Sequence, residues 1–231
     1  ASLSTLGMVA TASVIGCKNS TENTTVIASA NTAIQPIVIA TWLVPNATAK
    51  AWEVLQNGGT ALDAVEQGCM IEEADLKNVS VGKGGLPDRD GNVTLDACIM
   101  DKDGNYGAVM CVQNITHVIS LARKVMEKTP HVILAGKGAE EFGYEQGFKK
   151  ENLLTESSKK AWKKWKETSQ YKPIINIENH DTIGMLAIDS FGDISGACTT
   201  SGLSYKMAGR VGDSPIIGSG LFIDNEIGGA T

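Results

Sequence analysis

The chain has 231 residues, of which 42% are hydrophobic and 20% are charged, and its formal net charge at pH 7 is -6. This length and composition fit a globular protein with a full-sized core and exclude a chain that is disordered throughout. The basic residues cluster in one segment, 159–166. In an acidic chain this is a weak signal for nucleic-acid binding, and we expect no nucleic-acid partner. The five cysteines include no CxxC pair, so neither a disulfide scaffold nor a structural zinc site is expected.

Residues 1–17 differ in composition from the rest of the chain. They carry no charged side chain, and their apolar centre, 6–15, is too short and too weakly hydrophobic to span a membrane. The segment is typical of an export signal, and its end resembles a bacterial lipobox in which Cys17 is lipidated. We therefore expect an exported protein, periplasmic or anchored to the cell envelope if the source is bacterial. The alternative is a nonspecific tail rich in Ala, Ser and Thr. Residues 18–33, rich in Asn, Ser and Thr, predict a flexible tether.

The first elements after the tether are a strand and two helices. Residues 34–41 form a short apolar run rich in β-branched residues, which predicts a buried strand. Residues 47–57 carry apolar side chains at helical spacing. Thr60 then caps a second helix, with Asp63 three residues later as a weak capping box. Cys69 falls on the apolar stripe of that helix, so we expect it in the core.

Residues 81–91, VGKGGLPDRDG, form a glycine-rich segment. The segment fails the dinucleotide-binding pattern because Pro87 stands where the last glycine is required, and it lacks the GK[ST] of a P-loop. Asp88, Asp90 and Asn92 invite a calcium interpretation, but no EF-hand spacing follows. We therefore predict a turn.

Two strand hairpins are predicted, with helices between them. The strands are 93–100 with 106–112 and 183–188 with 194–199, and the helices are 118–128, 139–146 and 157–167. This order indicates an α+β protein. Periodicity does not choose between two antiparallel sheets with helices outside and a generic α+β fold.

The three histidines are His117, His131 and His180, and none lies in a local motif for a Ser-His-Asp triad or a zinc protease. The unusual stretch is His180-Asp181-Thr182, which places imidazole, carboxylate and hydroxyl directly before a strand. By spacing alone, a loop with an Asp turn is the preferred interpretation.

Several motifs give these residues a family context. HDTIGM at 180–185 is followed by GACTTSG at 196–202 and AGRVGDSPIIG at 208–218. Together they strongly resemble the glycosylasparaginase (aspartylglucosaminidase) family of N-terminal-nucleophile hydrolases. The likeness extends over 34–231 with further segments in the right order: TW at 41–42, GGTALDAVE at 58–66, SVGKGGLPDRDG at 80–91, TLDACIMD at 94–101, ARKVMEKTPHVILAG at 122–136 and GLFIDNEIGGAT at 220–231.

The resemblance implies a four-layer αββα sandwich and a precursor that cuts itself between Asp181 and Thr182, with His180 in the cleavage motif. The Thr182 hydroxyl would attack the Asp181 carbonyl in an N-to-O acyl shift, and water would hydrolyse the ester. The freed α-amine, with an unperturbed pKa of about 7.7–8.0, can then accept the proton of its own hydroxyl. This chemistry needs no catalytic histidine.

The family motifs imply roles for five more residues. Thr200 matches the threonine that contacts the nucleophile and assists the cut. Arg210 and Asp213 match the pair that binds the α-carboxylate and α-ammonium groups of the substrate, as their charges allow. Trp42 and, less specifically, Ser80 match residues of the pocket wall. From the residues alone, Arg210 and Asp213 could instead form a surface ion pair. Trp42 could instead pack in the core.

The implied reaction is hydrolysis of the amide that joins asparagine to N-acetylglucosamine in free glycosyl-asparagine, a late product of glycoprotein breakdown. It needs no metal or cofactor, and the cleaved αβ product is expected to form a homodimer. One rival is an isoaspartyl peptidase or L-asparaginase of the same superfamily. Another is an inactive, lipid-anchored binding protein.

The sequence departs from the family pattern at two places. Ala208 stands where the family usually has His. Family chains also continue beyond the segment that matches 227–231, into a Thr-Gly pair that supplies the oxyanion donors. The resemblance therefore implies a sandwich that is incomplete at the C-terminus. We expect residues 34–231 alone to be inactive, because losing one oxyanion donor typically costs about 10²–10³ in rate.

Overall fold

The computed structural model describes residues 34–169 and 182–231. The signal-like segment 1–17, the tether 18–33 and the cleavage residues His180 and Asp181 lie outside the described residues. Within the described part, no helix is both long and apolar enough to cross a membrane.

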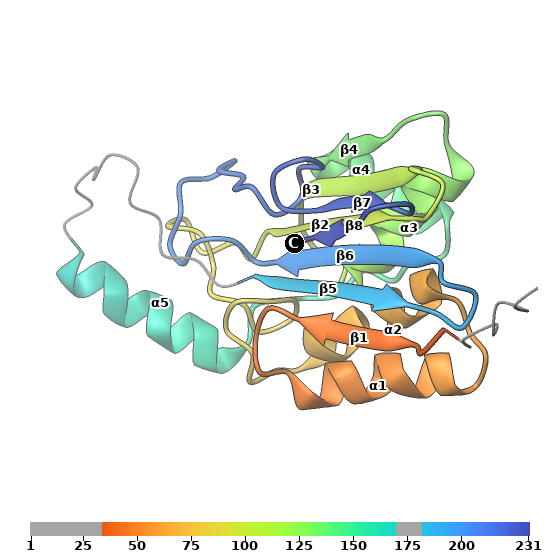
Figure 1. Cartoon of the computed structure of the whole chain (residues 1–231). Coiled ribbons are helices and arrows are strands. Elements are labelled where there is room, and N and C mark those ends of the chain that lie inside the picture. Colours follow the sequence, from red (N-terminus) through yellow and green to blue (C-terminus); the bar gives the residue numbers. More distant parts are fainter. Residues whose placement is uncertain (1–33, 170–181) are drawn as a thin grey trace, which may run out of the picture. The chain divides into compact units, whose positions relative to one another are not determined.

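A six-stranded mixed sheet forms the centre of the fold, with strand order β1-β5-β6-β2-β3-β4 (Figure 1). The strands are β1 (Ile37–Ala40), β2 (Leu95–Met100), β3 (Tyr106–Val112), β4 (Ile133–Ala135), β5 (Ile183–Ile188) and β6 (Ile194–Thr200). Both predicted hairpins are confirmed, as β2–β3 and β5–β6, and antiparallel pairing of β2 with β6 joins them. Strands far apart in the sequence thereby become neighbours.

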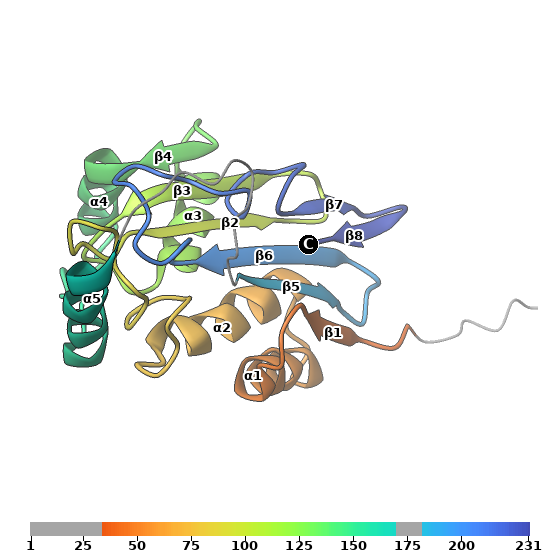
Figure 2. The same cartoon turned by 90° about the vertical axis from the view of Figure 1, so that its left-hand side faces the viewer.

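Helices cover one face of this sheet: α1 (Pro45–Gln56), α2 (Ala61–Ala74), α3 (Val118–Lys128) and α4 (Gly136–Glu145). Figure 2 shows α1 and α2 side by side beneath β1, β5 and β6. The predicted N-terminal cap of α2 is confirmed, because Thr60 Oγ1 accepts a hydrogen bond from Asp63 N at 3.1 Å. The Asp63 carboxylate accepts from the Thr60 hydroxyl at 2.7 Å. A fifth helix, α5 (Glu156–Thr168), lies beyond the ends of β5 and β6 (Figure 1).

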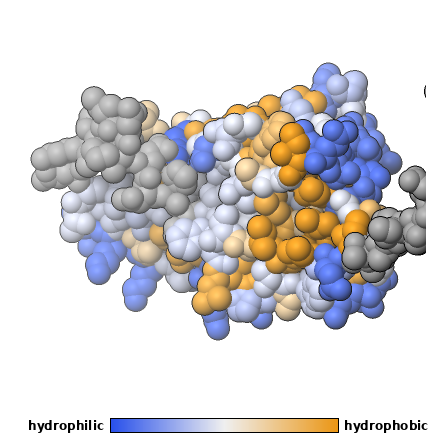
Figure 3. Space-filling model, in the orientation of Figure 1, coloured by the Kyte–Doolittle hydropathy of each residue, from blue (hydrophilic) through white to orange (hydrophobic). Residues whose placement is uncertain are grey.

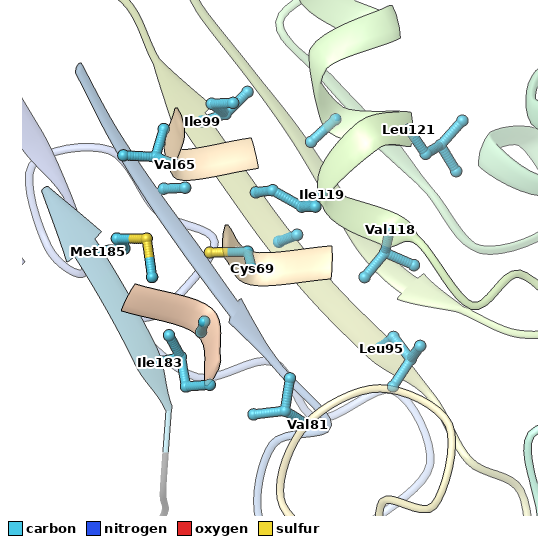
Figure 4. Close-up of a cluster of buried hydrophobic side chains, with 14 of the residues drawn as sticks. Val65, Cys69, Val81, Leu95, Ile99, Val118, Ile119, Leu121, Ile183 and Met185 are labelled. Carbon is cyan, nitrogen blue, oxygen red and sulfur yellow. The ribbon is translucent and has the colours of Figure 1, made fainter. Parts of the chain in front are cut away.

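The main core lies between the helices and the sheet (Figure 4). Val65 and Cys69 of α2 meet Ile119 of α3, Met185 of β5 and Ile99 of β2, and each of these side chains is 0% exposed. The prediction that Cys69 is a core residue is confirmed. Because successive side chains of a strand point to opposite faces of the sheet, every second strand residue faces away from these helices.

A second, two-stranded sheet of β7 (Phe222–Asp224) and β8 (Gly228–Ala230) packs over β2 and β6 on the face away from the helices (Figure 1). It closes a smaller apolar cluster that includes Cys98, Cys198 and Ile223. The α+β class is confirmed: the described residues supply a helical layer, the large sheet and two strands of a facing sheet.

Hydrophobic residues gather on the side of the molecule that faces the viewer in Figure 3. Ile37 and Ile39 of β1 are about half exposed.

Several elements differ from the sequence prediction. The prediction of a buried strand over 34–41 is wrong, because β1 is an edge strand in which Ile37 and Ile39 are about half exposed. The short strands β7 and β8 were not predicted. Strand β4 was not expected, because its three residues pair with β3 alone and are too few to show a period. Helix α4 begins at Gly136 rather than at residue 139. Its first residues are glycine and lysine, which carry no apolar pattern.

Candidate active site

The sheet topology brings three segments together at one end of strands β1, β5 and β6. Strand β1 ends at Ala40, next to the start of β5, and β6 ends at Thr200 beside that same start. Because β1 and β6 both run antiparallel to β5, the residues after β1, before β5 and at the end of β6 converge. Trp42, Thr182 and Thr200 therefore lie at the same end of the sheet, although up to 158 positions separate them in the chain.

A cavity of about 230 Å³ opens at this end of the sheet. Thr182, Trp42 and Asp213 line it, together with Thr41, Gly184, Cys198, Ser214, Gly220 and Thr231. Trp42 is 54% exposed, so the core-packing alternative for this residue is wrong. Its indole instead forms part of the cavity wall.

Thr182 is held at both its hydroxyl and its carbonyl group. Its Oγ1 lies 2.7 Å from Ser214 Oγ, and its carbonyl oxygen accepts a hydrogen bond from Thr41 Oγ1 at 3.1 Å. The Thr41 hydroxyl oxygen in turn accepts from Gly184 N at 3.1 Å, which ties β1 to the start of β5. A Cβ atom at Gly184 would overlap the Thr231 side chain, so glycine keeps this part of the cavity open.

Thr200 and Ser80 lie beside the cavity, at the end of β6 and next to the glycine-rich loop. Thr200 Oγ1 donates to Ser80 O at 3.4 Å and accepts from Gly202 N at 2.9 Å, and Thr200 makes a further interaction. The Ser80 hydroxyl donates to Asn78 Oδ1 at 3.1 Å. Neither residue, nor Arg210, is among the described residues that line the cavity. The structure thus joins Thr182, Trp42 and Asp213 in one cavity, whereas the other three residues lie outside its lining.

The Arg210 guanidinium lies close to the backbone of two glycines. A Cβ atom would stand 3.3 Å from Arg210 Nη1 at Gly202 and 2.9 Å from it at Gly212. Glycine at these positions therefore lets the guanidinium approach the loop. A planar, always-charged donor of this kind suits a carboxylate ligand.

Lys206 is a buried cation behind Arg210 that the sequence analysis missed. Its side chain is 1% exposed, and its Nζ donates to Ser201 O at 2.9 Å and lies 3.6 Å from Asp96 Oδ2. Burial raises the pKa of Asp96, and the nearby charges of Lys206 and Arg210 oppose that rise. In the sequence, Lys206 belongs to no motif or charge cluster, so only the packing reveals that Asp96 is its partner.

A second buried network anchors the end of β6 to the helices. Glu73 of α2 is fully buried and accepts hydrogen bonds from Thr199 Oγ1 at 2.7 Å and Ile119 N at 2.9 Å. Its other oxygen lies 3.3 Å from His117 Nδ1. Burial raises the pKa of Glu73, and the hydrogen bond with Glu73 raises the pKa of His117. The network thus holds Thr199, the neighbour of Thr200, from the helical side of the sheet.

The glycine-rich loop and the aromatic residues of α5 have structural roles. Asp88 Oδ1 accepts hydrogen bonds from the backbone nitrogens of Asp90 and Asn92 at 3.0 and 2.9 Å, which confirms the predicted turn. Trp165 stacks on Tyr205 with ring centroids 4.6 Å apart, and Trp162 Nε1 donates to the backbone carbonyl of Arg89, so both tryptophans pack against the loops beside α5. Within the described ranges, no cluster of His, Cys, Asp and Glu could hold a metal ion.

Comparison with known proteins agrees with the geometry. A sequence profile of a family described as asparaginase matches residues 23–231. The chain belongs to this asparaginase family. It is 65% identical over 198 residues to N(4)-(Beta-N-acetylglucosaminyl)-L-asparaginase of Elizabethkingia miricola, covering 85% of this chain and 58% of that protein. It is 39% identical over 226 residues to the rat protein of that name, covering 84% of this chain and 66% of the relative.

Other members of the asparaginase family carry a different name. The chain is 42% identical over 190 residues to isoaspartyl peptidase/L-asparaginase of Xenopus laevis, covering 80% of this chain and 60% of that protein. The chain thus spans between 58% and 66% of the length of these curated relatives. The resemblance to the N-terminal-nucleophile hydrolases is confirmed.

Proposed function

We propose that the protein is an amidohydrolase that cleaves the amide between asparagine and N-acetylglucosamine in glycosyl-asparagine. The observation that carries this proposal is the 65% identity to a relative named for that reaction, combined with a cavity that holds Thr182, Trp42 and Asp213. Because the matched segment covers 58% of that relative, the activity is proposed for the full-length protein.

The proposed mechanism uses Thr182 as an N-terminal nucleophile. Its Oγ1 attacks the side-chain carbonyl carbon of the substrate asparagine, while its α-amine accepts the hydroxyl proton. That proton passes to the departing nitrogen of the glycosylamine, and the aspartyl ester left on Thr182 is hydrolysed by water to release aspartate. Thr200, at the end of β6, assists the nucleophile from the border of the cavity.

The remaining residues would bind the substrate. Asp213 lines the cavity and suits the α-ammonium group. Arg210, whose guanidinium lies close to Gly212 beside Asp213 in the chain, suits the α-carboxylate. Trp42 is exposed at the wall and would contact the sugar side, with Ser80 supporting the neighbouring loop. The amino-acid end of the substrate would then be enclosed and the sugar would extend outward.

We also propose that the active form arises by self-cleavage between Asp181 and Thr182. N-terminal sequencing of the smaller fragment should give Thr-Ile-Gly-Met. Thr182→Ala should abolish cleavage and turnover, Thr182→Ser should retain part of both, and Thr182→Cys should still cleave because a thiol makes the same acyl shift. An intact single chain with full activity would contradict the proposal.

A second candidate is isoaspartyl peptidase or L-asparaginase activity, because relatives of that name are 40–42% identical to the chain. The discriminating assay compares kcat/KM for glycosyl-asparagine, asparagine and a β-aspartyl dipeptide. We expect glycosyl-asparagine to be preferred. A higher kcat/KM for the dipeptide would select the second candidate, and binding without turnover would indicate an inactive binding protein.

We further propose export to the periplasm or cell envelope with lipidation of Cys17, and a homodimer of the cleaved αβ unit. Mass spectrometry of the peptide that begins at Cys17 tests the lipid, and sedimentation of the cleaved protein tests the dimer. An unmodified Cys17 or a monomer would contradict the respective proposal.

A further inference from the structure

Thr182 has different proton acceptors before and after self-cleavage. In the cleaved enzyme its nitrogen is a free amine that can take the hydroxyl proton. In the uncleaved chain the same nitrogen belongs to a peptide bond, whose lone pair is delocalised and not basic. The acyl shift therefore needs another group to receive the proton of the Thr182 hydroxyl.

Ser214 is placed to receive that proton. Its Oγ lies 2.7 Å from Thr182 Oγ1, a short hydrogen-bonding distance for two hydroxyl groups. A serine hydroxyl has one hydrogen to donate and two lone pairs that accept, so it can accept from Thr182 and donate elsewhere at the same time. Ser214 is thus in direct hydrogen-bond contact with the hydroxyl that must lose its proton.

The backbone around Ser214 fixes its position. The residue is 3% exposed, and its carbonyl oxygen accepts a hydrogen bond from Cys98 Sγ at 3.2 Å. The backbone of Gly220 packs directly on it, since a Cβ atom there would stand 2.6 Å from Ser214 Cα. A hydroxyl on such a fixed backbone is held in place before the reaction begins, as a catalytic group requires.

We propose that Ser214 is a catalytic residue of self-cleavage that relays the proton of the Thr182 hydroxyl. As the bond from Thr182 Oγ1 to the Asp181 carbonyl carbon forms, Ser214 Oγ accepts the hydroxyl proton. It gives its own proton to the nitrogen that leaves when the bond between Asp181 and Thr182 breaks. Ser214 ends unchanged, and the products are an ester and a free amine. After cleavage the amine is the base, so Ser214 only orients the nucleophile.

This inference rests on the proposed function, and the test uses the full-length protein with the variants Ser214→Ala and Ser214→Thr. Ser219→Ala is the matched control, because Ser219 is an exposed serine five positions further along the same loop. The cleavage rate is followed by mass spectrometry of the fragment that begins at Thr182. Turnover of glycosyl-asparagine is normalised to the amount of that fragment, and thermal melting reports the fold.

We expect Ser214→Ala to slow self-cleavage by about 10²-fold or more, as for loss of a proton-transfer group. Its kcat should fall by about tenfold or less with an unchanged KM, because the amine then serves as base. Ser214→Thr should restore most of the cleavage rate, and Ser219→Ala should match the wild type. Cleavage of the wild type should be slower in D₂O, and this isotope effect should shrink in Ser214→Ala.

Two results would overturn the inference while leaving the proposed function intact. One is a Ser214→Ala protein that cleaves at the wild-type rate. The other is an equal loss in cleavage and kcat together with a lowered melting temperature, which would make Ser214 structural. A wild-type protein that neither cleaves nor turns over substrate would instead overturn the proposed function, and the inference with it.

Discussion

The buried pair of Lys206 and Asp96 leads to a quantitative prediction. Lys206→Met preserves much of the side-chain volume but removes the ammonium group that donates to Ser201 O at 2.9 Å and faces Asp96 at 3.6 Å. Asp96 is 0% exposed, so its carboxylate would lose a partner that water cannot replace. Breaking a buried ion pair from one side typically costs about 3–5 kcal/mol. We expect a loss of that size in the free energy of unfolding at pH 7.

The loss should depend on pH in a defined direction. Burial raises the pKa of Asp96 in the folded protein above its ordinary value, and removing Lys206 should raise that pKa further. A group with a raised folded pKa stabilises the fold below its unfolded pKa and loses that contribution as the pH rises through the folded pKa. The deficit of Lys206→Met relative to the wild type should therefore be smaller at pH 4 than at pH 7.

Urea denaturation of the wild type and the variants at both pH values measures these quantities. Asp96→Asn combined with Lys206→Met removes both charges and should be less destabilised than Lys206→Met alone. Lys164→Met on the exposed face of α5 is the control and should change stability by less than about 0.5 kcal/mol. A loss of less than about 1 kcal/mol of stability in Lys206→Met would contradict this role of the buried ion pair, whose breaking should cost far more. So would a double variant that is no more stable than the single one.

Three further predictions concern binding, pH and helix capping. Arg210→Ala should weaken substrate binding by about 2–4 kcal/mol, seen as a raised KM, while self-cleavage continues; an unchanged KM would make Arg210 structural. The hydrogen bond with Glu73 raises the pKa of His117 above the ordinary histidine value of about 6.5, so its contribution to stability is complete below about pH 6.5 and is lost as the pH rises through the raised pKa. The urea midpoint should therefore fall as the pH rises from about 6 to about 8.5, and His117→Gln should flatten that fall; an unchanged slope would refute the role of the pair. Thr60→Ala should destabilise the protein by about 1 kcal/mol in urea, because α2 loses the cap that accepts from Asp63 N at 3.1 Å, and a change near zero would show that the cap is dispensable.

Most local elements could be predicted from the sequence alone, and its motifs supplied the candidate site residues. Periodicity predicted both hairpins and most helices, since an apolar face must repeat every two or 3.6 residues. The capping box at Thr60 and the turn at Asp88 were also predictable, because each depends on side chains that bond to backbone a few residues away. The motif around Thr182 led to the proposed nucleophile through family resemblance rather than spacing.

Which distant residues meet could not be predicted from the sequence, because it depends on how the strands assemble into a sheet. Strand order depends on which apolar faces bury the most surface together, and this is a property of the whole chain rather than of any short segment. That order places Thr182 beside Ser214, 32 positions away, and Lys206 against Asp96, 110 positions away. In the sequence Ser214 is one serine of a loop and Lys206 one lysine among many. Their partners, and hence their roles, exist only once the sheet is assembled.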